Sequence, residues 1–246
     1  MSMHSIPQSK IYTDVANVYS HIMRKVHYDY WADYIYSITS NFIGEHPKVL
    51  ELASGNCQLA YYLSAYYPKY FSTDISVTML ALGKKELRNK VCCDMRFIPF
   101  KSKFDLIVSA FDSFNYLLSK KDLLFAFSEV KQLMDQNSLF TFDVSLEKNS
   151  YRHVKDPIRK GTYKGVKYKQ ETDFNDKTKL HRNVFHITYH DGTVAKEIHL
   201  QKIYSFETYF ELMDDAGLSV KECFDAFTYK DGKSTSSRVQ FIAVKK

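Results

Sequence analysis

The alternation of strand-like and helix-like segments between residues 48 and 144 constrains the fold more than any other feature. Short apolar segments typical of buried strands lie at 48–52, 70–73, 91–93, 104–109 and 139–144. Segments with the spacing of amphipathic helices lie at about 58–66, 76–89 and 120–134. Strands that alternate with helices in this way pair in parallel, and the helices cross over between them. We therefore predict an α/β fold with a doubly wound, Rossmann-like sheet.

The pattern changes after residue 150. Apolar and polar residues then alternate to about residue 204, and turn signals occur at Lys164-Gly165, Asn175-Asp176 and Asp191-Gly192. These features are typical of antiparallel hairpins. A helix is predicted at 205–216, followed by two strands at about 219–227 and 239–244.

We predict one main domain with an insertion. Residues 1–149 and 205–246 form the main domain, and residues 150–204 form the antiparallel β insertion. Helical spacing from about residue 10 to residue 42 predicts helices within the N-terminal residues 1–44.

Composition and charge restrict the class of protein. The chain has 246 residues, 45% of them hydrophobic and 25% charged, which suits a globular protein with a real core. Its formal charge of +6 is scattered, so nucleic-acid binding is not favoured. No apolar segment is long enough to span a membrane, and the N-terminus is polar. We expect a cytoplasmic protein, either a monomer or a homodimer.

The cysteines and histidines predict neither disulfides nor a metal site. Cys57, Cys92, Cys93 and Cys223 form no C-x-x-C pair, so we interpret them as reduced thiols. The histidines of the insertion fit alternating strand faces rather than a ligand set; they are His181, His186, His190 and His199.

Three acidic residues follow three successive predicted strands: Glu51, Asp74 and Asp94. In an open parallel sheet, ligands bind at the carboxyl ends of the strands. Asp74 comes 23 residues after Glu51, and a carboxylate at this position can accept both hydroxyl protons of a ribose. Asp94 could accept a hydrogen bond from the exocyclic amine of adenine. The sequence therefore predicts a nucleoside site at this edge.

The loop after the first strand distinguishes between kinds of nucleoside. A dinucleotide needs several glycines so that backbone amides can approach its pyrophosphate. Gly55 is the only glycine in residues 53–57. S-adenosylmethionine has no phosphate, so Ala53 and Cys57 are tolerable for that ligand, and a nicotinamide enzyme is the weaker interpretation.

Several segments together resemble class I S-adenosylmethionine-dependent methyltransferases. These segments are VLELASGNC at 49–57, STDISVTML at 72–80, CDM at 93–95 and FDLIV at 104–108. The segment FDSFNYL at 111–117 resembles the small-molecule branch, which includes amino-sugar N-methyltransferases and carries a β-sheet insertion after the fifth strand. The resemblance implies a seven-stranded methyltransferase sheet whose last strand is antiparallel. It also implies that residues 1–44 and the insertion act as lids, the insertion on the acceptor side.

The resemblance implies S-adenosylmethionine as the cofactor and gives a role to each of its binding residues. The methionine end would be held by Glu51, Ala53, Ser54 and Gly55, and covered by Tyr12, Tyr19 and Trp31. The ribose hydroxyls would bind Asp74, and the adenine would contact Ile75, Met79, Asp94 and Met95. Ala110 and Phe111 would close the pocket beneath the sulfonium. Ala53 and Cys57 stand where the family usually has glycine.

Catalysis requires mainly that the acceptor is aligned and water excluded, because the sulfonium is already a good leaving group. We predict that Tyr116 or Asp112 orients the acceptor. The alternative interpretation is that Asp112 caps a turn and Asn115 supports it. His199 could line the acceptor pocket as a base.

The leading prediction for the function is methyl transfer to a small molecule, at nitrogen in preference to oxygen. Two alternatives are an RNA or protein methyltransferase and a non-catalytic S-adenosylmethionine-binding protein. The sequence names no acceptor.

Overall fold

A computed structural model describes residues 11–246, so the predictions for residues 1–10 lie outside the described residues. The main domain begins with helices α1 (Ala16–Ile22) and α2 (Tyr28–Thr39). It continues with β1 (Lys48–Leu52), α3 (Gln58–Tyr66), β2 (Lys69–Asp74), α4 (Val77–Leu82), β3 (Lys90–Cys92), β4 (Phe104–Ser109), the 3-10 turn η3 (Ser113–Tyr116), α5 (Lys120–Gln132) and β5 (Met134–Ser145). After the insertion it ends with α7 (Phe206–Asp215), β10 (Leu218–Asp225) and β11 (Arg238–Lys245).

The main sheet has seven strands in the order β10-β11-β5-β4-β1-β2-β3. The pairs from β5 to β3 are parallel, whereas β11 is antiparallel to both β5 and β10. This confirms the predicted Rossmann-like methyltransferase sheet and its antiparallel last strand. The strand order reverses between β1 and β4, so a crevice is expected at the carboxyl ends of these strands.

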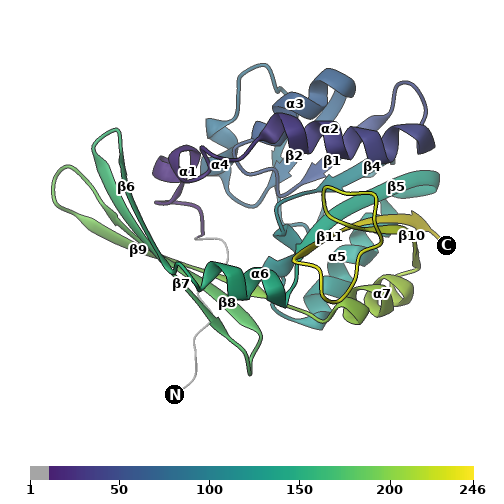
Figure 1. Cartoon of the computed structure of the whole chain (residues 1–246). Coiled ribbons are helices and arrows are strands. Elements are labelled where there is room, and N and C mark those ends of the chain that lie inside the picture. The colour runs from purple at the N-terminus through teal and green to yellow at the C-terminus, as the bar shows by residue number, and fades with distance from the viewer. Residues whose placement is uncertain (1–10) are drawn as a thin grey trace.

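Helices cover both faces of the main sheet (Figure 1). Successive residues of β4 alternate between the faces: Ile107 packs with α5 and α7, whereas Leu106 and Val108 pack with α2 and α3. Many phenylalanines fill the α5 and α7 side, and Phe127 and Phe142 are completely buried there. Burial on both faces explains why the central strands are continuous apolar segments.

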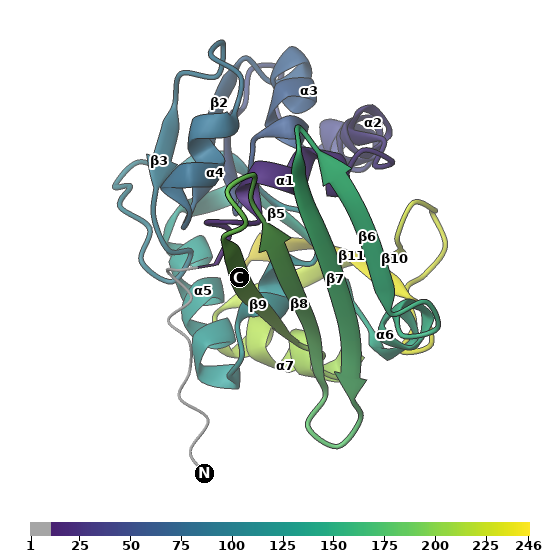
Figure 2. The ribbon, with the colours of Figure 1, turned by 90° about the vertical axis from the view of Figure 1, so that its left-hand side faces the viewer.

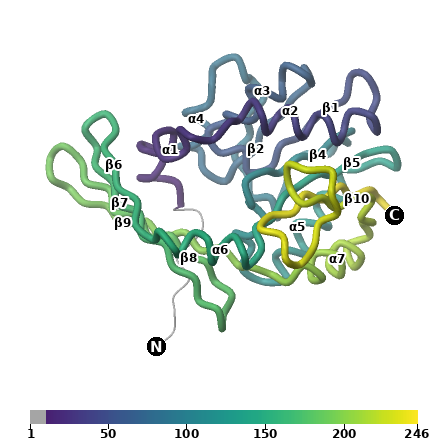
Figure 3. The backbone as a smooth tube through the Cα atoms, in the orientation of Figure 1, coloured from purple at the N-terminus to yellow at the C-terminus, as the bar shows by residue number. Residues whose placement is uncertain are grey.

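The insertion forms a second sheet, as predicted. Its strands β6 (Ile158–Tyr163), β7 (Val166–Asn175), β8 (Leu180–Thr188) and β9 (Val194–Lys202) pair antiparallel in sequence order. Figure 2 shows this sheet in front of α1, and residues of α1 and β7 pack together. Figure 3 traces the backbone from the main sheet through α6 (Glu147–His153) into the extended hairpins.

One local prediction was wrong, and one helix was missed. Helix α4 ends at Leu82 rather than near residue 89, and Ser76 caps its start by accepting a hydrogen bond from the Met79 amide. Helix α6 was not predicted, because its residues 147–153 lack an apolar repeat and the residue before it is Leu146, which cannot cap a helix. Among residues 11–246, no helix is long and apolar enough to cross a membrane.

Candidate functional site

The loop after β1 folds against the end of β2 and is held there by Asp74. One Asp74 carboxylate oxygen accepts from the Gly55 amide at 2.7 Å, and the other accepts from the Ser76 amide at 2.8 Å. The Ser54 amide also donates to the Thr73 carbonyl at 2.8 Å. Burial raises the pKa of Asp74, although these backbone amides oppose the shift. The predicted proximity of the two strand ends is therefore present in the structure.

Three residues of this loop have left-handed backbone conformations, although only one is glycine. The φ angles are 54° at Ala53, 54° at Gly55 and 56° at Cys57. The Cys57 side chain lies against Gly83, where an added Cβ would be 3.0 Å from the Cys57 sulfur. Cys57 lines neither of the cavities described below. Its extra volume is therefore accommodated by Gly83, away from the site.

Glu51 lies beneath the loop and is almost completely buried, with 2% of its surface exposed. The Tyr70 hydroxyl donates a hydrogen bond to its carboxylate at 3.1 Å. Burial raises the pKa of Glu51 to about 8, despite the opposing effect of the Tyr70 hydrogen bond. A buried carboxyl group of this kind favours a positively charged partner.

A small cavity of 90 Å³ opens at the ends of β1, β2 and β4. Most of the predicted cofactor-binding residues line it: Tyr12, Tyr19, Ala53, Gly55, Asp74, Ile75, Met79, Asp94, Met95 and Phe111. Tyr116 also lines it, whereas Glu51, Ser54, Trp31 and Ala110 do not. No residue of β6–β9 contributes to this cavity among the described residues.

Asp94 has a close partner that the sequence did not indicate. Both of its carboxylate oxygens accept hydrogen bonds from the Arg96 guanidinium, at 2.6 to 3.1 Å. Arg96 also pairs with Asp122 at 2.7 Å. Asp94 therefore lines the cavity as part of an ion pair, and not as an isolated carboxylate.

A larger cavity of 310 Å³ lies beside the first, between α1, α2, α6 and the inner face of the second sheet. The two cavities share an aromatic wall of Tyr12, Tyr19, Phe111 and Tyr116. Trp31 lines the larger cavity and packs on Phe111, with ring centroids 4.3 Å apart.

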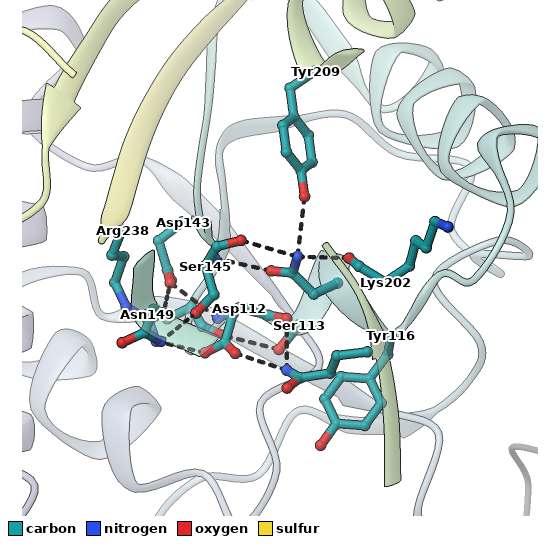
Figure 4. A network of polar contacts seen from close by, with 12 residues as sticks. Asp112, Ser113, Tyr116, Asp143, Ser145, Asn149, Lys202, Tyr209 and Arg238 are labelled. Carbon is teal, nitrogen blue, oxygen red and sulfur yellow. Dashed lines mark hydrogen bonds and ion pairs between the residues drawn. The ribbon is translucent and has the colours of Figure 1, made fainter. Parts of the chain in front are cut away.

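Asp112 belongs to a charged network at the base of this larger cavity (Figure 4). Its carboxylate pairs with Arg238 at 2.7 Å and accepts from Gln201 at 2.7 Å. Arg238 also pairs with Asp143, which accepts from the Asp112 amide at 2.9 Å. The side chain of Asp112 makes no cap to the following turn. The sequence offered two roles for Asp112, acceptor orientation and a turn cap, and the structure does not show the turn cap.

Asn115 is completely buried and links three elements. Its amide group donates to the Lys202 carbonyl at 2.9 Å and to the Tyr209 hydroxyl at 3.1 Å, and its oxygen accepts from the Ser145 amide at 3.0 Å. Figure 4 shows the Tyr209 hydroxyl directed at this junction. Asn115 thus holds the turn that contains Tyr116 against β5 and β9.

Tyr116 lies in a chain of polar side chains between the cavities. Its hydroxyl is 2.7 Å from the Tyr12 hydroxyl and 3.2 Å from His199 Nδ1. His199 Nε2 is 2.7 Å from the Glu197 carboxylate. Sequence reasoning missed the roles of Glu197 and Arg238. The Glu-x-His spacing within a strand could have indicated Glu197, because such residues share one face.

Comparisons with known proteins find similarity to methyltransferases. Residues 49–137 match the family model described as "Methyltransferase domain". The chain is 24% identical to the Geobacillus sp. (strain WCH70) protein named "Putative methyltransferase GWCH70_2453", over 95% of this chain and 99% of that protein.

Two solved structures share the fold. The S-adenosylmethionine-dependent methyltransferase from Clostridium acetobutylicum ATCC 824 has a TM-score of 0.80 and 22% identity, over 95% of this chain and 98% of that one. The sugar N-methyltransferase KedS8 from Streptoalloteichus sp ATCC 53650 has a TM-score of 0.76 and 13% identity, over 100% of this chain and 97% of that one.

Proposed function

We propose that this chain is an S-adenosylmethionine-dependent methyltransferase and that it methylates a small molecule held in the larger cavity. The match of residues 49–137 to the methyltransferase domain model supports the activity. The observation that carries the proposal is the aromatic wall shared by the two cavities. A cofactor in the smaller cavity and an acceptor in the larger one would meet at this wall. Aromatic faces there also favour a sulfonium cation.

The smaller cavity would take the adenosine of S-adenosylmethionine, which supplies an activated methyl group. Asp74 would accept the ribose hydroxyl protons, Ile75 and Met79 would flank the adenine, and Met95 with the Asp94–Arg96 pair would lie at the adenine edge. Ala53, Ser54 and Gly55, with Glu51 below them, would hold the methionine end. The smaller cavity has a volume of only 90 Å³, well below the ~300–1,000 Å³ of typical small-molecule sites. Residues 11–26 would therefore have to move outward before the cofactor could enter.

The same N-terminal segment would close the site after binding. Its docked position is fixed by hydrogen bonds to the loops after β1 and β2: Asn56 donates to the Ser20 hydroxyl at 3.2 Å, and Ser76 donates to the Tyr12 carbonyl at 3.0 Å. Closure over the sulfonium would exclude water from the transferring methyl group. We therefore treat residues 11–44 as the cofactor lid and β6–β9 as the acceptor-side lid.

The larger cavity suits a small polar acceptor. Its sheet face presents the amides of Gln170 and Asn183 together with His181. Burial lowers the pKa of His181 to about 4, so this ring is neutral at pH 7 and available for hydrogen bonds. Asp112, fixed by Arg238, and Tyr116 would orient the acceptor near Phe111.

Nitrogen is the favoured acceptor atom. A neutral amine attacks the methyl carbon without a strong base, whereas a hydroxyl needs one. The fold shared with a sugar N-methyltransferase supports the same preference.

Isothermal titration with S-adenosylmethionine and S-adenosylhomocysteine tests the cofactor assignment. We expect about micromolar binding by the wild type and at least a tenfold loss in Asp74→Ala, because hydrogen bonds to a carboxylate are worth roughly 1.5–3 kcal/mol. Asp173→Ala is the matched control, because Asp173 is exposed in the second sheet and pairs only with Arg182 among the described contacts. Folded wild-type protein that binds neither ligand would refute the proposal.

A further inference from the structure

A hydrogen-bonded chain connects the aromatic wall to a buried carboxylate in the second sheet. It runs from Tyr12 to Tyr116, from Tyr116 to His199 Nδ1, and from His199 Nε2 to Glu197, with distances of 2.7, 3.2 and 2.7 Å. The chain spans three separate segments: the N-terminal segment, the η3 turn and β9. His199 and Glu197 are 2% and 6% exposed, so solvent contributes little to their partners.

The chemistry of Glu197 fixes the direction of every hydrogen bond in this chain. Burial alone would raise the pKa of Glu197, but the His199 hydrogen bond and backbone amides keep it lowered, so its carboxylate is ionised and only accepts. His199 Nε2 must then carry a hydrogen, and in a neutral ring Nδ1 is bare. Tyr116 therefore donates to Nδ1, and Tyr12 donates to Tyr116.

The same carboxylate also fastens the N-terminal segment. One oxygen accepts from the Tyr12 amide in addition to His199, and the other accepts from the amides of Asp14 and Val15 at 2.9 and 3.1 Å. Four N–H groups thus converge on a single buried carboxylate. Three of them come from the segment that would have to open for the cofactor.

We propose that Glu197 is a positioning residue that couples closure of residues 12–15 over the cofactor to assembly of the Tyr116–His199 proton acceptor. The inference rests on the proposed function and deepens it. In the closed state Glu197 holds His199 in the tautomer with a bare Nδ1, and Tyr12 completes the chain at the wall. When the segment opens, Tyr12 leaves the chain and Glu197 loses three of its donors.

Once the acceptor nitrogen has taken the methyl group it is an ammonium, and the chain would remove one of its protons. That N–H bond breaks and a new O–H bond forms at Tyr116, while the former Tyr116 proton bonds to His199 Nδ1. The imidazolium that results lies against the Glu197 carboxylate, which stabilises its charge. Burial raises the pKa of Tyr116 well above its ordinary value, so the tyrosine passes the proton on rather than existing as a phenolate.

The groups that face His199 are consistent with Glu197 as the carboxylate that orients its ring. Tyr12 contacts its ring from the N-terminal segment, Tyr116 from η3 and Phe185 from β8, while Glu197 lies on its own strand. Asp112 acts on Tyr12 and Tyr116 at longer range and is itself paired with Arg238. Glu197 is thus the carboxylate in direct contact with the ring.

Glu197→Gln tests the coupling, because an amide cannot accept all four N–H groups. We expect S-adenosylhomocysteine to dissociate at least about tenfold faster, since losing one partner of a buried charged pair mainly raises dissociation rates. Stopped-flow fluorescence can follow this, because Trp31 is the only tryptophan and lines the larger cavity. Nitrogen-15 NMR of the imidazoles should show His199 as a single Nε2–H tautomer in the wild type and as a mixture in Glu197→Gln.

Three further variants separate the two functions of Glu197. Glu171→Gln is the matched control, because Glu171 pairs with His186 on the exposed surface of the same sheet and should change neither readout. His199→Gln keeps the lid anchor, so dissociation should be slower than in Glu197→Gln. Glu197→Asp keeps the charge and should retain the tautomer if Glu197→Gln fails to fold.

Each failure has its own signature. Wild-type dissociation rates and a wild-type His199 spectrum in Glu197→Gln would overturn the coupling. An absence of S-adenosylhomocysteine binding by the wild type would refute the proposed function, while the NMR spectra would still decide the Glu197–His199 assignment.

Discussion

Glu51 should release a proton when the cofactor binds. Burial raises its pKa from 4.5 to about 8, so at pH 7 about nine in ten molecules carry a proton on Glu51. The proposed ligand brings an ammonium group to this carboxyl, which stabilises the ionised form. Binding at pH 7 should therefore release about 0.9 proton for each S-adenosylmethionine bound.

The same shift sets the pH dependence of affinity. Below pH 8 the free protein must lose the Glu51 proton before it can pair with the ammonium group, so affinity should fall about eightfold as the pH is lowered from 7.5 to 6.5. Without ligand, the folded state holds a proton that the unfolded state gives up above pH 4.5. The free energy of unfolding should therefore decrease as pH rises from about 4.5 to about 8.

Calorimetry in two buffers with different ionisation enthalpies counts the released protons directly. Glu51→Gln should reduce the count to near zero and remove the pH dependence of affinity, whereas the exposed Glu171→Gln should leave both as in the wild type. Tight binding by the wild type with no proton released would refute the reasoning, because it would show that Glu51 is already ionised or never meets the ammonium group.

Two further predictions concern stability. Arg238→Met leaves Asp112 and Asp143 without their cation and should lower the free energy of unfolding by roughly 3–5 kcal/mol at pH 7. Burial raises the pKa of Asp143, so urea titrations should show a smaller loss of stability at pH 5.5. An equal loss at both pH values would contradict the inference that an ionised Asp143 causes the destabilisation. Lys164→Gly should raise the free energy of unfolding by about 0.5–1 kcal/mol, because Lys164 has a φ of 47° in a two-residue hairpin turn that favours glycine. Lys160→Gly, in the middle of β6, should destabilise the protein in the same titration, and the turn argument fails if both variants behave alike.

The parts of the site that follow from local sequence were predictable. Strand ends place Asp74 and Gly55 at one edge once a parallel sheet is inferred, and the structure joins them by a 2.7 Å hydrogen bond. Periodicity likewise gave the hairpins of the second sheet, because alternation directly reflects the two faces of a strand.

The parts that depend on packing between distant segments were not predictable. Arg238 lies 126 residues after Asp112, and Glu197 lies 185 residues after Tyr12, so no spacing rule connects them. The burial that raises the pKa of Glu51 also arises only when β2 and β4 flank β1 and Tyr70 contacts the carboxyl group. Helix α6 forms against β7 rather than through any periodicity of its own.

The separation of the two cavities affects how this protein can evolve. The second sheet contributes residues to the larger cavity but none, among the described residues, to the smaller one. Under the proposed function, substitutions on the inner face of β6–β9, at Gln170 or Asn183, should change which molecule is accepted and leave the proposed cofactor cavity intact. Selection for a new substrate can therefore act on this face alone. A chimaera that exchanges residues 158–188, and so keeps Glu197 and His199, should inherit its selectivity from the donor of that stretch.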